Sequence, residues 1–148
     1  MQDVSETYSD KLMGFTLPGR SARGRVVRLD GVLEQVLSAH DYPAPITHLL
    51  GEALVLGALM GGLLKGESAQ MTMQAQTNGG IVSLLVCDYR GGAVRGYCDF
   101  DAERLGSLGA NPSLSALFGE GYLAITFETE GRQRYQGIVP LEGDSLAE

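Results

Sequence analysis

The stretch that decides the fold is ITHLLGEALVLGALMGGLL, residues 46–64. It is apolar on every side, and a helix of this kind either lies at the centre of a domain or crosses a membrane. Its length would allow crossing, but His48 and Glu52 would then enter the bilayer, where one carboxylate costs at least ~2.5 kcal/mol. We therefore predict the central helix of a domain, over about residues 45–65, and no membrane partner.

The glycines of this helix bear on how it packs. They lower its stability as a free helix, but the missing Cβ lets another backbone approach closely. These positions are Gly51, Gly57, Gly61 and Gly62. Pro45 suits the first helical turn, where its missing N–H costs nothing.

After Gly66 the pattern changes from a helical period to a strand period. Ala69, Met71, Met73 and Ala75 alternate with polar residues, which is typical of a half-buried strand. Asn78-Gly79-Gly80 predicts a tight turn into an interior strand over 81–87, and Arg90-Gly91-Gly92 a turn into a third strand over 93–100. The sequence thus predicts a three-stranded antiparallel meander.

Other segments complete an α+β fold, in which antiparallel sheets pack with helices in a single domain, residues 1–148. Two helices are predicted, over 31–39 with Asp30 as N-cap, and from Asn111-Pro112 to Phe118. The apolar face of the first comprises Val32, Leu33, Val36 and Leu37. Strands are predicted over 15–29 (irregular, partly exposed and broken at Pro18-Gly19), 122–128 and 134–141.

The last four residues, Ser145-Leu146-Ala147-Glu148, form the S-x-x-E pattern of a capping box. This pattern marks the start of a helix. We therefore expect the chain to be the N-terminal part of a longer protein.

Charge and composition limit the partners of this chain. Eighteen acidic and 11 basic residues give a net charge of −7, which disfavours nucleic acid and anionic membranes as partners. Arg20, Arg23, Arg25 and Arg28 form a basic cluster that either binds phosphate or, as we favour, blunts an exposed strand edge. The N-terminus has no pattern of a secretory signal, and two cysteines are too few for a disulfide framework. A cytoplasmic location is predicted.

No catalytic, cofactor-binding or metal site is predicted. The sequence contains no nucleophile elbow, and Lys65 in the glycine-rich stretch lacks the setting of a phosphate loop. His48 is expected in the core with Glu52, one turn later, as its partner. His40 is expected to contact the terminal carbonyls of the first helix. Met71 and Met73 are expected in the core rather than on a binding surface.

Cys87 and Cys98 lie on neighbouring strands of the meander. If Arg90-Gly91 is the turn, Cys87 pairs with Val94 and the two cysteines are four residues apart, roughly 13 Å. A register shifted by one residue places them on opposite faces. Neither arrangement allows a disulfide or a shared metal, so both are expected to be small core residues.

Several segments, read as whole strings and in this order, resemble the heat-shock protein 33 family, the redox-regulated holdase chaperones of bacteria. The strings are ARGRVVRLD (22–30), SAHDYP (38–43), LLGEALVLGALMGGLLKG (49–66), MTMQAQTNGGIVSLLVCDYRGGAVRGYCDFD (71–101), LFGEGYLAITFE (117–128) and RYQGIVPLEGDSLAE (134–148).

The resemblance implies the N-terminal substrate-binding domain of such a chaperone, with helices held between antiparallel sheets. It implies ATP-independent binding of unfolded client proteins in the stress response, no enzymatic activity, and homodimers that exchange segments. The family's single zinc and its four cysteines would lie outside this chain, so no cofactor is expected here, and the client-binding residues stay unknown. Two alternatives remain: a thiol-dependent enzyme using Cys87 or Cys98 with His40 or His48, or a small-ligand or protein-interaction module of the same fold.

Overall fold

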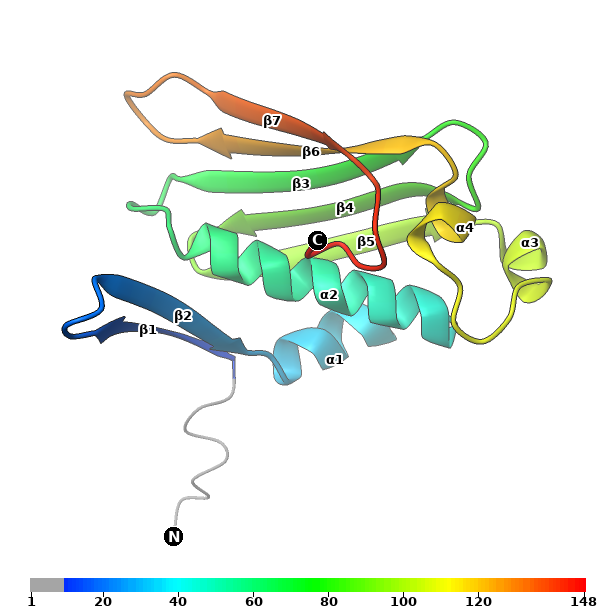
Figure 1. Cartoon of the computed structure of the whole chain (residues 1–148), viewed down its shortest axis with the longest axis horizontal. Helices are drawn as coiled ribbons and strands as arrows, with labels where there is room; N and C mark the ends of the chain where they lie inside the picture. Colours follow the sequence, from blue (N-terminus) through cyan, green and yellow to red (C-terminus); the bar gives the residue numbers. More distant parts are fainter. Residues whose placement is uncertain (1–9) are drawn as a thin grey trace, which may run out of the picture.

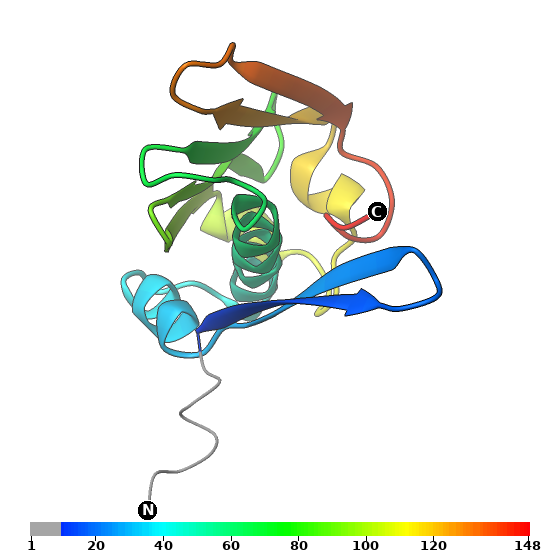
Figure 2. The same ribbon diagram turned by 90° about the vertical axis from the view of Figure 1, so that its left-hand side faces the viewer.

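Helix α2 lies between a five-stranded sheet and a two-stranded hairpin in the computed structural model, which describes residues 10–148 (Figures 1 and 2). The α+β class is therefore confirmed. In chain order the elements are β1 (Lys11–Leu17), β2 (Ala22–Arg28), α1 (Gly31–Ser38), α2 (Ala44–Gly61), β3 (Gln70–Thr77), β4 (Val82–Arg90), β5 (Ala93–Phe100), α3 (Ala102–Gly106), α4 (Leu114–Phe118), β6 (Gly121–Glu128) and β7 (Tyr135–Pro140). The segment that was assessed for a secretory signal, residues 1–9, lies outside the described residues.

The central helix is confirmed but ends earlier than predicted. Gly62 caps α2, and its N–H donates to the carbonyl of Ala58. The chain then tightens into two further turns, in which Leu63 and Leu64 donate to Met60 and Gly61. By length and composition α2 could cross a membrane, and 44% of it is buried inside this domain. Its buried residues are Ile46, Leu49, Leu50, Ala53, Leu54, Gly57, Ala58 and Gly61.

The large sheet is antiparallel throughout, in the order β5-β4-β3-β6-β7. The predicted meander forms its β3–β4–β5 part, and the predicted period-2 pattern is confirmed. One face, here called the inner face, packs on α2 and forms the core. Its buried side chains include Met71, Met73, Ala75, Leu85, Cys87, Cys98 and Leu123. The opposite, outer face carries the alternate residues.

The N-terminal segment differs from the prediction of one irregular strand. It forms a hairpin of two seven-residue strands, β1 and β2, paired from Lys11↔Arg28 to Leu17↔Ala22. The predicted break at Pro18-Gly19 is its turn, in which Gly19 has a φ of 79°. A positive φ favours glycine, so the residue that disrupts one long strand instead connects two.

Two short helices also required correction. Helix α4 begins at Leu114, because the Ser113 side chain, not Asn111, accepts the capping hydrogen bond from the Ala116 N–H. Helix α3 was not predicted, and Asp101 caps it by accepting from the Arg104 N–H at 3.1 Å.

The cap of α1 comes from a residue 20 positions away. Asp30 occupies the predicted N-cap position, but its side chain makes no capping hydrogen bond. The Asp10 carboxylate instead accepts from the N–H groups of Asp30, Gly31 and Val32 at 2.8, 3.0 and 3.1 Å. The Asp30 hydrogen bond is the main cause that lowers the pKa of Asp10. This carboxylate ties the start of the hairpin to the start of α1.

Candidate functional site

The β1–β2 hairpin exposes a group of large apolar side chains. With Leu63, which follows α2, they form what we call the hairpin surface: Leu12, Met13, Phe15, Leu17, Val26 and Leu63, each 37–57% exposed. The sequence reasoning assigned no function to these residues. The string KLMGFTL was an available signal, because it places apolar residues on both faces of a strand, and such a strand usually needs a partner.

A groove separates the hairpin from the C-terminal end of α2. It is lined by Gly14, Phe15, Thr16, Arg23, Gly24, Arg25, Leu59, Met60 and Leu63. The Phe15 ring lies over Gly24, its partner on β2, and fills the space that a Cβ at Gly24 would need. The lining of the groove thus combines apolar side chains with Arg23 and Arg25.

The arginine-rich strand β2 is exposed, which suits both a blunted strand edge and a phosphate-binding cluster. Within residues 10–148 the ion pairs are Arg95–Asp88 and Arg134–Glu128, away from the hairpin. The groove arginines therefore remain free of carboxylates in the described part of the chain. They give the hairpin surface a positive fringe on a protein whose net charge is −7.

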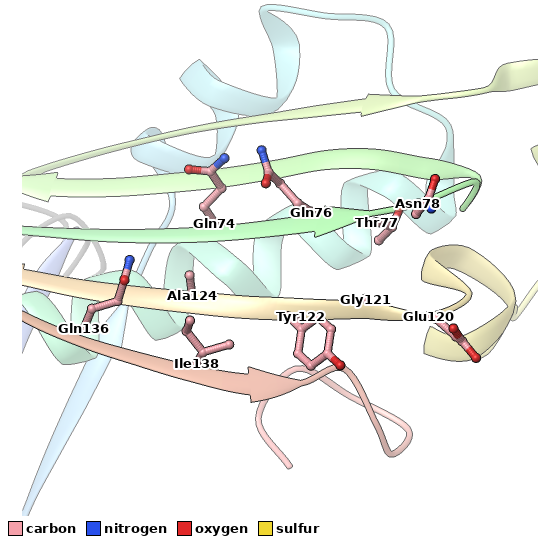
Figure 3. Close-up of a pocket in the computed structure, with 10 residues that line it drawn as sticks. All are labelled: Gln74, Gln76, Thr77, Asn78, Glu120, Gly121, Tyr122, Ala124, Gln136 and Ile138. Carbon is pink, nitrogen blue, oxygen red and sulfur yellow. The ribbon is translucent and has the colours of Figure 1, made fainter.

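A second apolar region lies on β6 and β7, at one edge of the large sheet. Its exposed side chains are Tyr122, Tyr135, Ile138 and Val139. Figure 3 shows the hollow on the outer face beside β7, where Ala124 and Ile138 lie between Gln136 and Tyr122. Ala124 pairs with Ile138 across the strands, and its small side chain leaves the depression.

The cysteines are buried, as predicted, but their register was predicted wrongly. The turn is Gly91-Gly92, so Cys87 pairs with Gly96 and Cys98 with Leu85. The cysteines are thus diagonal neighbours on the inner face, with Cα atoms about 7–8 Å apart rather than 13 Å. Both are free thiols.

Burial gives these thiols little nucleophilic character. Together with the nearby carboxylates of Asp88 and Asp99, it raises the pKa of Cys87 and of Cys98 to about 12. Since the thiolate is the reactive form, this environment disfavours the thiol-dependent enzyme.

Neither histidine lies where the sequence reasoning placed it. His48 is exposed, not in the core. Its expected partner Glu52 accepts instead from the Ala147 N–H at 3.0 Å, 95 residues away. The His40 ring packs against Tyr42 and Tyr97, with centroid distances of 5.4 and 5.2 Å, rather than on the carbonyls of α1.

Met71 and Met73 are fully buried under α2, so the prediction that they belong to the core is confirmed. In residues 10–148 no three His, Cys, Asp or Glu side chains gather closely enough to hold a metal ion. The expected capping box does not form. The Glu148 carboxylate accepts from the Asp144 N–H at 3.0 Å rather than from Ser145, and the Glu148 N–H donates to the Ser145 carbonyl at 3.4 Å.

The α+β architecture is shared with a solved structure, the 33 kDa chaperonin (Hsp33 homologue) of Thermotoga maritima. The TM-score is 0.74 at 24% identity, and the match covers 92% of this chain and 47% of that one. The fold is therefore that of a 33 kDa chaperonin.

The chain belongs to the Hsp33 family, whose sequence model, described as Hsp33 protein, matches residues 10–148. The 33 kDa chaperonin of Caulobacter vibrioides (strain NA1000 / CB15N) is 41% identical over 143 residues, which cover 93% of this chain and 47% of the relative. That of Pseudomonas aeruginosa (strain LESB58) is 37% identical, with 96% and 46% covered. The chain thus spans about half the length of the curated relatives it matches.

Proposed function

We propose that this chain is the client-binding part of an ATP-independent holdase, a chaperone that binds unfolded proteins in the cytoplasm and keeps them from aggregating. Membership in a family whose members are named 33 kDa chaperonin supports a chaperone role. The observation that carries the proposal is the hairpin surface with its groove, because this apolar area is open to solvent and is not part of the hydrophobic core.

The strength of binding expected from the hairpin surface suits a holdase. Its six side chains are about half exposed, and completing the burial of each contributes about 1 kcal/mol. A total of roughly 6 kcal/mol is largely offset by the loss of translational and rotational freedom on association. Binding is therefore weak at one site and reversible, and it depends on apolar area rather than on a client's sequence.

The redox control implied by the family resemblance belongs, in this proposal, to the part of the protein beyond this chain. A zinc module with four cysteines would restrain the client-binding surface until oxidation releases the metal. Cys87 and Cys98 do not suit that role, because both lie in the core under α2. Client binding by this chain is then constitutive. The proposal also includes a homodimer in which the two copies exchange segments.

The test uses light scattering from a thermally unfolding client in the presence of this chain. The double variant Met13→Ser/Leu63→Ser removes two side chains of the hairpin surface, each more than half exposed. The control Tyr97→Ser removes an exposed aromatic from the outer face of β5, away from the hairpin. We expect the double variant to lose most of the suppression and the control to keep it. Equal suppression by both variants would contradict the assignment of the hairpin surface.

A further inference from the structure

Strand β7 is an open edge of the large sheet (Figure 1). It pairs with β6 on one side, from Tyr135↔Phe127 to Pro140↔Tyr122. No other strand in residues 10–148 pairs with its second side. An open edge offers unpaired backbone N–H and C=O groups to any extended chain.

The hydrogen bond at the end of β7 shows which residues offer those groups. The Leu141 N–H donates to the Gly121 carbonyl at 3.0 Å, which continues the β6–β7 register by one pair. Hydrogen-bonded and non-hydrogen-bonded pairs alternate in an antiparallel ladder. Gln136 and Ile138 therefore direct both backbone groups away from β6. The backbone N–H position of Pro140 also points away from β6, so the N–H that proline lacks removes no hydrogen bond from the sheet.

The opposite edge of the sheet, β5, is protected in two ways that β7 lacks. The Tyr42 hydroxyl accepts from the Cys98 N–H at 3.3 Å and so occupies one outward position. The ring of His40 packs beside it against Tyr97. Residues 135–141, YQGIVPL, contain no charged side chain, and charged side chains are the usual means of blunting an edge.

Apolar side chains flank the open edge on both faces. Ile138, 62% exposed, lies on the outer face beside the hollow at Ala124 (Figure 3). Tyr135 and Val139, 64% and 48% exposed, lie on the inner face. An added strand would place its alternate side chains against these two faces.

We propose that β7 captures an extended, uncharged and largely apolar segment of an unfolded polypeptide, which pairs with Gln136 and Ile138 as a sixth strand. This inference rests on the proposed function and adds a second contact, one that recognises the backbone of the client. A second copy of this chain is a poorer occupant. A six-residue strand covers only ~200 Å² per partner, against about 800 Å² per partner in a typical stable complex.

The direct test is amide hydrogen exchange of the 148-residue chain with and without a reduced, carboxymethylated protein that stays unfolded. We expect the client to slow exchange at Gln136 and Ile138, the two outward amides. The amides of Gly137 and Val139 already face β6 and should change less. This alternation distinguishes strand pairing from general coverage of the surface.

A matched pair of variants tests the same contact by affinity, measured as the fluorescence anisotropy of the labelled client. Ile138→Pro removes an outward N–H without removing a bond to β6, whereas Ile138→Ala shortens the side chain and keeps the N–H. We expect the proline variant to bind three- to tenfold more weakly than the alanine variant. This difference corresponds to about one hydrogen bond. The unfolding midpoint of each variant shows whether the sheet is intact.

The remaining outcomes overturn the inference in distinguishable ways. A client that binds the unaltered chain without slowing exchange at Gln136 and Ile138 removes the β7 contact and leaves the proposed function standing. Slowed exchange at these amides that depends on protein concentration and needs no client assigns the edge to a second copy. No client binding by the unaltered chain overturns the inference together with the proposed function.

Discussion

Replacing Gly57 by alanine will destabilise this protein, although a glycine-to-alanine replacement inside a helix usually raises the stability of a protein. A Cβ at Gly57 would lie 2.6 Å from the Sγ of Cys87 and 3.5 Å from the Cε of Met71. Cys87 and Met71 are fully buried under α2, so neither side chain can move into solvent. The helix would have to shift away from β4 to admit one methyl group.

The magnitude follows from two opposing effects. Glycine to alanine in a helix contributes about 1 kcal/mol through propensity, and overpacking a tight core costs about 1–3 kcal/mol. Gly51 in the same helix is the control, because a Cβ there meets nothing within 4 Å. The Gly51→Ala variant should gain up to about 1 kcal/mol, and the Gly57→Ala variant should lie about 1–3 kcal/mol below it.

Urea unfolding measures this difference. With a slope of ~2 kcal/mol per molar urea, the midpoints of the two variants should differ by about 0.5–1.5 M. Adding Cys87→Ala frees the space that the new Cβ needs, so the penalty of Gly57→Ala should shrink in that background. Equal gains in stability for both glycine variants would refute the close packing of α2 on β4.

Three further predictions concern charge, thiols and client binding. Hydrogen bonds lower the pKa of Asp10 below its ordinary value, so its stabilising effect should be present at neutral pH and fade as the pH falls below about 4; acid unfolding of Asp10→Asn should show a smaller pH dependence there. Cys87 and Cys98, with pKa values near 12, should react with iodoacetamide at pH 7 far more slowly in the folded than in the urea-unfolded chain, and equal rates would contradict their burial. Client suppression by this chain should be the same with and without peroxide and change little with salt, as light scattering at two salt concentrations can show; suppression only after oxidation would refute constitutive binding.

The turn between β4 and β5 shows where sequence reasoning failed although the information was present. A two-residue hairpin turn of the favoured hand needs a positive φ at both central residues. Gly91 and Gly92 meet this at 56° and 82°, whereas Arg90 would have been strained in such a conformation. Preferring Gly91-Gly92 over Arg90-Gly91 moves the register by two residues and brings the cysteines onto diagonal positions. Glycine at both central positions was the deciding signal.

Other features could not have been predicted from local patterns. The buried faces of α1 and β3 follow from periodicity, and they were predicted correctly. The carboxylates of Asp10 and Glu52, in contrast, accept from backbone groups 20 to 95 residues away. Nothing near either residue in the sequence specifies such a partner, because only the folded chain brings the carboxylate and the backbone N–H together. His48 was misplaced for the same reason: a helix that is apolar all round does not reveal which side the sheet covers.

In the proposed function, the two apolar regions hold an unfolded chain in complementary ways. The hairpin surface offers side-chain contact, and its two strands depend on α2 and on Asp10 for support, since an isolated hairpin is marginally stable. The β7 edge belongs to a five-stranded sheet and offers fixed backbone positions. Every unfolded protein carries a free backbone, whereas apolar clusters differ from client to client. A domain that uses both contacts can therefore hold many sequences, and each contact alone is weak enough for release.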